Sequence, residues 1–453
     1  MPIIHVNSPS RLTKAAPLRA HIVVDLGFGD AGKGLLTDFL VRRLNAGLVV
    51  RYNGGAQAGH NVVTADGRHH TFSQFGSGSF VPHVKTFLSR HVVIHPTALL
   101  VEGDLLQAKG VPNPFARIGI SERALVITPF HQALNRVRER MRGSFRHGSC
   151  GVGVGEAVAD SLAHPESRIL AGDLNRPDIL RRKARDIRRR TWEEARSLLR
   201  EGTPDAGARR EYALFEDESV VGEWVAALAR IRELGLVMDD GALARWLVEA
   251  GDVVFEGAQG VLLDEEAGFH PYTTWSRCTS RNAEELAGEM MPGAQVSRIG
   301  VVRAYAVRHG PGPLPTESGE VGAVVSEHNQ NNEWQGAVRY GWFDAALTRY
   351  ALDATGGVDH LAVTHVDAIP RLPVWKFCAR YEGFAGFAPP SARLEERAAL
   401  TESLLKIKPA LETCAAEEET ALGALEASLG QPVTMVSRGR RAEDVEWVGR
   451  GGK

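Results

Sequence analysis

The chain has 453 residues, of which 43% are hydrophobic and 24% are charged, as is typical of a folded globular protein. Its 53 basic and 55 acidic residues give a formal net charge of −2, which excludes a strong overall attraction to nucleic acid or to a membrane surface. The four cysteines are scattered and form no CxxC pair, which argues against a zinc knuckle or a disulfide scaffold and favours a reducing compartment. No apolar run approaches the ~18 residues of a membrane span, and the N-terminal residues lack the apolar core of a signal peptide. We therefore expect a cytoplasmic protein with neither a membrane nor a nucleic-acid partner.

The first clear element of the chain is an apolar run at residues 21–26, which is typical of a buried parallel strand. Residues 1–19 before it show no periodicity, and we interpret them as a flexible arm that precedes a single domain over residues 20–453. Glycines follow the strand, and residues 35–40 have apolar side chains at helical spacing. A strand, a glycine-rich turn and a helix in this order open an α/β nucleotide-binding unit. Further short strands are expected at residues 48–50, 92–94, 252–255, 299–302, 360–364 and 433–436.

These strands predict an α/β fold with a large, mostly parallel central sheet that is flanked by helices and binds ligands at the carboxyl ends of its strands. Residues 175–250 are charge-rich and predicted to be helical, and residues 392–430 read as amphipathic helix. The arginine runs within residues 175–250 have almost no interleaved aromatic residues. A solvated helix face is therefore favoured over the alternative, a nucleic-acid patch.

The strongest local signal is the segment Gly27–Gly34, which has the Walker spacing of a glycine, four residues and Gly-Lys. Glycines let backbone N–H groups approach phosphate, and the following helix N-terminus adds partial positive charge. The Ser or Thr that usually binds Mg²⁺ after the lysine is replaced by glycine, so Asp30 is the natural metal ligand. The alternative is a tight strand-to-helix turn without a ligand. The residues that we expect to bind phosphate are Gly29, Gly32, Lys33 and Gly34.

A second polar, glycine-rich cluster covers residues 51–61 and contains His60, for which we favour a role as a catalytic acid over a purely structural role. Three more segments share this character, at residues 255–260, 308–317 and 363–367. The last of them offers Asp367, a carboxylate that could read the N1 and N2 hydrogens of guanine. An aspartate after a strand is also often only a helix cap.

Taken in order, these segments resemble the motifs of the adenylosuccinate synthetase family, the GTP-dependent ligases of AMP synthesis. The resemblance runs from about residue 21 to residue 445 and implies the family's P-loop-like nucleotide-binding fold, GTP as co-substrate, Mg²⁺ and a homodimer. The family's phosphate loop GDEGKG is similar to residues 29–34, with an alanine in place of the glutamate. The other matching motifs lie at residues 51–60, 255–260, 262–264, 271–274, 312–317 and 341–344.

The resemblance also implies a mechanism and roles for single residues. In the family, an aspartate of the phosphate loop removes the proton from purine N1, O6 attacks the γ-phosphate of GTP, and the amine of aspartate then displaces phosphate. Asp30 would be this base and a Mg²⁺ ligand, His60 would stabilise the transferring phosphoryl group, and Gly59 would offer its carbonyl to the metal. The residues implied to contact the purine substrate are Gln57, Ser149, Gln259 and Thr274, and those implied to contact guanine are Asp367 and Ser437.

The chain departs from the family pattern around the 5′-phosphate of the nucleotide. Gln57 stands for an asparagine, Ser149-Cys150 stand for a Thr-Thr pair, and His164 aligns with the arginine that the neighbouring subunit lends in the family. His365 replaces a lysine before the guanine-reading aspartate, which weakens the case for strict use of GTP over ATP.

The loop at residues 333–339, which aligns with the family's loop for the amino-acid substrate and is called the amino-acid loop below, also departs from the family pattern. Gly336 and Val338 align with two arginines that clamp the carboxylates of aspartate, and Glu333 and Trp334 lie beside them. Arg339 and the nearby Arg308 are the remaining candidates for binding the amine donor. We therefore expect an active ligase with an altered amine donor, nucleotide acceptor or both. An ordinary adenylosuccinate synthetase and a non-catalytic nucleotide-binding relative are the alternatives.

Overall fold

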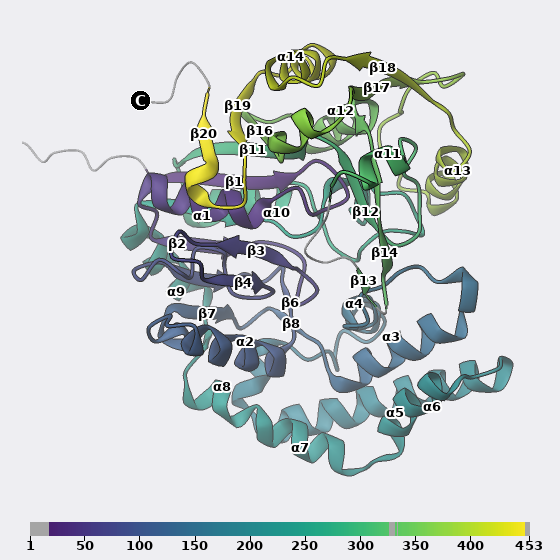
Figure 1. Ribbon diagram of the computed structural model, residues 1–453. Helices are drawn as coiled ribbons and strands as arrows, with labels where there is room; N and C mark the ends of the chain where they lie inside the picture. Colours follow the sequence, from purple (N-terminus) through teal and green to yellow (C-terminus); the bar gives the residue numbers. More distant parts are fainter. Residues whose placement is uncertain (1–17, 326–330, 333, 449–453) are drawn as a thin grey trace, which may run out of the picture.

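The computed structural model describes residues 18–325, 331–332 and 334–448, and its centre is a ten-stranded sheet (Figure 1). All neighbouring strands of this sheet run parallel except β19 and β20. In spatial order the strands are β20 (Val445–Trp447), β19 (Val433–Ser437), β16 (His360–Thr364), β11 (Gln295–Arg303), β1 (Arg19–Asp25), β10 (Asp252–Glu256), β2 (Leu48–Arg51), β5 (Lys85–Leu88), β7 (Ile118–Ser121) and β9 (Val237–Met238). The predicted fold class is thus confirmed.

Helices cover the sheet and extend beyond it at both ends (Figure 1). In Figure 1 the blue and teal helices α3 and α5–α7 gather along the lower side of the molecule, and α12 and α14 lie at the top. The helices are α1 (Lys33–Leu44), α2 (Pro96–Ala108), α3 (Pro129–Met141), α4 (Val154–Ala163), α5 (Pro177–Glu201), α6 (Ala206–Glu216), α7 (Ser219–Ala227), α8 (Ala229–Glu233), α9 (Asp240–Ala250), α10 (Arg281–Met290), α11 (Gly319–Gly322), α12 (Ala345–Thr355), α13 (Leu394–Leu404) and α14 (Glu418–Leu429). Within the described part of the chain, no helix combines the length and the apolar character needed to cross a membrane.

Four small sheets lie outside the central sheet. They are formed by β12 (Ala306–His309) with β14 (Gly336–Gly341) and β13 (Asn331–Asn332), by β15 (Phe343–Asp344) with β17 (Trp375–Tyr381) and β18 (Pro409–Cys414), by β3 (His60–Val63) with β4 (His69–Phe72), and by β6 (Val93–Ile94) with β8 (Leu125–Val126). Two expectations are corrected here. The strand expected at residues 92–94 does not join the central sheet, and residues 392–430 contain the strand β18 between two helices.

The structure adds detail at the N-terminus and in the charge-rich segment. Residues 1–17 of the expected arm lie outside the described residues, and β1 already begins at Arg19. The charge-rich segment is helical over α5–α9 apart from the short edge strand β9. Helix α5 buries an apolar stripe at three- to four-residue spacing, and its arginines lie on the exposed or half-buried outer face. The buried residues of this stripe are Leu180, Ala184, Ile187, Thr191 and Ala195.

Candidate active site

A cavity of about 1060 Å³ collects most of the residues that the sequence marks as functional. Its walls come from the phosphate loop, the segment around His60, the segment between α3 and α4, and the loops that follow β10 and β12. The predicted residues that line it are Gly29, Asp30, Lys33, Gln57, Gly59, His60, Ser149, Gln259, Thr274 and Arg308. Segments far apart in the sequence therefore meet in one pocket, as expected where parallel strands end.

The phosphate loop is folded around the carboxylate of Asp25, which is the last residue of β1 and is 1% exposed. One oxygen of Asp25 accepts the N–H groups of Gly27 at 2.9 Å and Gly29 at 3.3 Å. The other accepts the N–H group of Ala31 at 2.9 Å and the ammonium of Lys33 at 2.8 Å. Sequence reasoning missed Asp25, although an acidic residue inside an apolar strand was a usable signal.

The turn from this loop into α1 requires glycine at position 32. Gly32 caps the helix with φ 94°, a left-handed conformation that glycine adopts without strain. A Cβ atom at this position would lie 3.2 Å from the side chain of Thr364 on β16. Helix α1 therefore starts at Lys33, which is 3% exposed and forms part of the cavity wall.

Asp30 lies in the phosphate loop and contacts residues of β11 and β12, which are distant in the sequence. Its own φ is 59°, its carboxylate lies 2.8 Å from Nε2 of His309, and its carbonyl accepts a hydrogen bond from the Arg303 guanidinium. Although desolvation raises the pKa of Asp30, the hydrogen bond and charge of His309, together with Arg303 and Lys33, lower this pKa to about 2. Asp30 is therefore ionised at neutral pH, which a base or a metal ligand requires.

His60, the first residue of β3, is oriented by a buried carboxylate. Its Nδ1 lies 2.6 Å from Glu256, which is fully buried at the end of β10. Glu256 also accepts the Ser77 N–H group at 3.0 Å and the Ser77 hydroxyl. Desolvation raises the pKa of Glu256, but Arg51 and His60 lower it to about 2. With Nδ1 donating to this carboxylate, Nε2 is the ring nitrogen left for a substrate.

Burial has opposite effects on the pKa values of His60 and Glu256. Desolvation lowers the pKa of His60, and the charge of Glu256 opposes this effect. The sequence placed Glu256 in a motif but gave it no role, because its partner lies 196 positions away in the chain.

The residues expected to contact the purine present polar groups to the cavity. Both side-chain polar atoms of Gln57 and the Oε1 of Gln259 are buried without a hydrogen-bond partner in the part of the chain that the structure describes. The Ser149 hydroxyl donates to Asn135 at 2.9 Å. Buried polar atoms without partners are costly, so these amides fit a site that a polar ligand completes.

The residues expected to read guanine lie outside this cavity lining. Asp367 is exposed in the turn after β16, and Ser437 ends β19, where its hydroxyl donates to the carbonyl of Gly439 at 2.7 Å. Since β16 and β19 are parallel neighbours, with Val363 opposite Val436, both residues lie at the same edge of the sheet. The structure thus places both residues at the carboxyl ends of neighbouring strands, outside the lining of the cavity that contains Asp30 and His60.

The two arginines expected to bind the amine donor are engaged by backbone carbonyls. Arg308 is 2% exposed, donates to Pro311 at 3.0 Å and to Pro313 at 3.1 Å, and its pKa is lowered to about 9 by burial and by Arg339. Arg339 does not line the cavity, and its two Nη atoms donate to the carbonyl of Gly312 at 3.0 and 2.8 Å. Their contact with an amine donor stays a prediction.

The other described residues of the amino-acid loop do not form a pair of arginines that could bind two carboxylates. The Trp334 ring packs under the guanidinium groups of Arg136 and Arg140 at 5.4 and 5.0 Å. Gly336 is exposed, and Val338 lies opposite His309 in the β12–β14 ladder. Glu333 lies outside the described residues.

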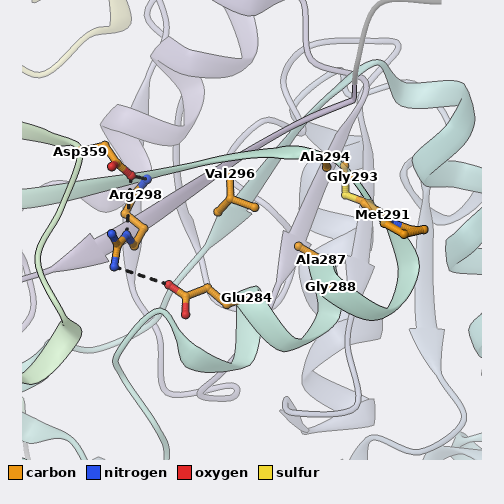
Figure 2. Close-up of a pocket in the computed structure, with 10 residues that line it drawn as sticks. Glu284, Ala287, Gly288, Met291, Gly293, Ala294, Val296, Arg298 and Asp359 are labelled. Carbon is orange, nitrogen blue, oxygen red and sulfur yellow. Dashed lines mark hydrogen bonds and ion pairs between the residues drawn. The ribbon is translucent and has the colours of Figure 1, made fainter.

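A second, smaller cavity of about 360 Å³ lies between α10 and the start of β11, and none of the predicted residues lines it. Figure 2 shows Arg298 at one side of it, between Glu284 and Asp359. The ion-pair distances are 4.0 Å and 3.6 Å. The larger cavity is therefore the candidate active site.

Comparison with known proteins identifies the family of this chain. The adenylosuccinate synthetase family model matches residues 22–445. The chain is 32% identical to an adenylosuccinate synthetase of Desulfovibrio desulfuricans over 366 aligned residues. This alignment covers 80% of this chain and 81% of the relative.

Two solved structures have the same fold. The fully ligated adenylosuccinate synthetase of Plasmodium falciparum superposes with a TM-score of 0.74 at 18% identity, over 95% of this chain and 99% of that one. The succinoaminodeoxyadenylate synthetase of cyanophage S-2L, bound to dGMP and to dATP as an energy donor, superposes with a TM-score of 0.59 at 18% identity, over 95% and 96%. The family match over nearly the whole chain, with the 32% identical relative, shows that this chain belongs to the adenylosuccinate synthetase family, whose members are ligases that form a C–N bond.

Proposed function

We propose that this protein is a GTP-dependent ligase that phosphorylates the carbonyl oxygen of a purine acceptor and replaces it with an amine, with an amine donor, an acceptor or both that differ from aspartate and IMP. One observation carries the proposal: Asp30 and His60 line the same cavity as Lys33, and each has its own orienting partner. Phosphoryl transfer depends mainly on positioning and charge neutralisation, which such an arrangement supplies.

In the proposed reaction Asp30 takes the proton from purine N1, and the C6 oxygen attacks the γ-phosphorus while GDP leaves. The amine then attacks C6, loses a proton, and displaces phosphate that carries the former carbonyl oxygen. In its protonated form His60 donates Nε2–H to the transferring phosphoryl group, and Glu256, which accepts Nδ1–H, favours this charged form of the ring. Lys33, at the cavity wall, would neutralise phosphate charge.

The donor set fits magnesium bound together with phosphate. The Asp30 carboxylate and the Gly59 segment both line the cavity, and hard oxygen donors suit this ion. Among the described residues, no group of three or more His, Cys, Asp or Glu side chains could hold a metal. Asp30 and the Gly59 carbonyl would therefore hold the ion with substrate oxygens, and bound magnesium would neutralise charge on the phosphates.

The altered amine donor is supported by the amino-acid loop. A dicarboxylate that loses water on binding needs two charges neutralised. Gly336 and Val338 carry no charge, and Arg339 already donates to the Gly312 carbonyl. An amine with fewer carboxylates than aspartate suits this loop better.

For the energy donor we propose GTP, read by Asp367 and Ser437 at their shared sheet edge. ATP is the alternative, because His365 replaces the family lysine and because the cyanophage neighbour was solved with dATP as its energy donor. We also infer a cytoplasmic homodimer, on the family resemblance.

An ordinary adenylosuccinate synthetase that uses IMP and aspartate is the second candidate. The name of the 32% identical relative favours it.

The test is phosphate release from GTP or ATP with Mg²⁺, over a panel of purine acceptors and amines, with product masses and with Asp30→Asn as the control. Release that requires both an acceptor and an amine, and that Asp30→Asn loses, supports a ligase. A product from any pair other than IMP and aspartate supports the altered specificity. A requirement for IMP and aspartate, with an aspartate KM below ~1 mM, supports the second candidate. No release with any pair contradicts both.

A further inference from the structure

The backbone of Asp30 is held by a side chain at the end of β11. Asp30 has φ 59°, a left-handed conformation that an aspartate keeps where its surroundings hold it. The guanidinium of Arg303, the last residue of β11, donates to the Asp30 carbonyl. Arg303 is buried, so water competes little for this hydrogen bond. Loss of the Arg303 side chain would therefore release the backbone that carries the proposed general base.

The next residue of the phosphate loop is held from the neighbouring strand. Thr364 ends β16 and lies opposite Arg303 in the parallel ladder of β11 and β16. Thr364 is fully buried, and its hydroxyl donates to the carbonyl of Ala31 at 2.8 Å. Two neighbouring strand ends thus bind two consecutive carbonyl groups of the loop, those of Asp30 and Ala31.

Two aromatic rings connect these strand ends to each other. The hydroxyl of Tyr305 accepts a second hydrogen bond from Arg303, at 3.1 Å. The Tyr305 ring contacts the ring of His365 edge-on, with the two centroids 5.8 Å apart. Nδ1 of His365 lies 2.9 Å from the hydroxyl oxygen of Thr364. The contacts therefore form a closed ring that begins and ends at the phosphate loop and includes His365.

His365 lies beside the residues that we propose to read the energy donor. It is half-buried, has φ 59° and precedes Asp367 by two positions. A purine base bound at Asp367 would restrict the turn that contains His365, and the ring of contacts would transmit this restriction to Asp30. Arg303 and Tyr305 are outside the lining of the main cavity, so they act through Asp30 and not on the substrate directly.

We propose that Arg303 is a positioning residue that holds Asp30 in its left-handed conformation, and that binding of the purine base of the energy donor beside His365 stabilises this arrangement. The inference rests on the proposed function, which makes Asp30 the general base and places the energy donor at Asp367. Arg303 transfers no proton itself. It couples the site of the energy donor to the site of the acceptor.

Steady-state phosphate release with the substrate pair that the panel identifies tests the positioning role. Arg303→Met removes the donors of the side chain and should lower kcat by ~10²-fold with little change in the KM of the acceptor, because a small misplacement of a reacting group is costly. Arg303→Lys keeps one donor and should recover part of this loss. Arg117→Met is the matched control, because Arg117 also donates to backbone carbonyls but lies outside the cavity lining, and kcat should be unchanged.

Hydrogen exchange of the phosphate loop tests the coupling without turnover. The probes are guanosine and adenosine, which carry a base but no phosphate that could bind the loop directly. In wild type at least one of them should slow exchange of the backbone amides of residues 27–34 by ~5-fold or more, and the active one identifies GTP or ATP as the donor. Arg303→Met and His365→Ala should lose this effect, whereas Arg117→Met should retain it.

Three results would overturn the proposal. If neither nucleoside slows exchange in wild type, the coupling is rejected, and this comparison decides even if no variant folds. Equal slowing in wild type and in His365→Ala also rejects it, because the nucleoside would then act from the main cavity. A kcat for Arg303→Met within ~2-fold of wild type rejects the positioning role. Failure of the proposed function has a different signature, namely slowed exchange as expected with no phosphate release for any substrate pair.

Discussion

Asp25→Asn should lower the free energy of unfolding by about 3–5 kcal/mol, which is the usual cost of removing one partner from a buried ion pair. Asp25 is 1% exposed and Lys33 is 3% exposed, so neither charge is screened by water. The substitution leaves the Lys33 ammonium buried without its counter-ion. It also replaces one acceptor oxygen by an NH₂ group that faces N–H donors of the phosphate loop.

The assay is equilibrium unfolding in denaturant, with two companion variants. Asp104→Asn is the control, because Asp104 and its partner Arg230 are 49% and 43% exposed, and it should cost ~1 kcal/mol or less. The double variant Asp25→Asn/Lys33→Met should recover most of the lost stability, because it removes both charges of the pair.

Two outcomes would refute this reasoning. The first is a loss within ~1 kcal/mol for Asp25→Asn, the range of an exposed pair. The second is a double variant that is no more stable than Asp25→Asn alone, because removal of the Lys33 charge would then recover nothing.

Four further predictions concern the site. Asp30→Asn should lower turnover by about 10²–10⁴-fold in the phosphate-release assay, and full turnover would reject Asp30 as the base. Glu256→Gln should lower kcat by about 10²-fold with little change in the KM for GTP, as expected if it orients His60 for the transition state; a change confined to KM would instead indicate a binding role. Because the folded pKa of Glu256 is about 2, below its unfolded value of ~4.3, its stabilising effect should be present above pH ~4.3 and lost as pH falls towards 2. Denaturation of wild type and Glu256→Gln between pH 6 and pH 2 checks this, and a stability difference that does not shrink would contradict it. EDTA should abolish phosphate release without changing the Tm, and Mg²⁺ should restore it; unchanged release in EDTA would exclude the magnesium proposal.

The local parts of the fold were predictable from the sequence, and the partners of the site residues were not. The strand at 21–26, the glycines after it and the helical segment at 35–40 follow from hydrophobic spacing and backbone freedom, which are properties of neighbouring residues. By contrast, Glu256 and His309 lie far along the chain from His60 and Asp30, with 196 positions between Glu256 and His60, and no local pattern reports such pairing.

The errors in the predicted fold have similar causes. An apolar run at residues 92–94 looks the same whether it joins a large sheet or pairs with the short strand β8 outside it, so its sheet was not predictable. β18 reads PALETC and is largely exposed, and its strand conformation follows from pairing with β17.

The most direct test of the proposed chemistry follows the carbonyl oxygen of the acceptor. An acceptor labelled with ¹⁸O at C6, once the panel has identified it, is converted with unlabelled GTP in unlabelled water, and the released phosphate is analysed by mass. Attack of this oxygen on the γ-phosphorus and its later displacement by the amine predict one ¹⁸O atom in each phosphate formed. Unlabelled phosphate from a reaction that still yields the aminated product would contradict the account, because the carbonyl oxygen would then have left without being phosphorylated.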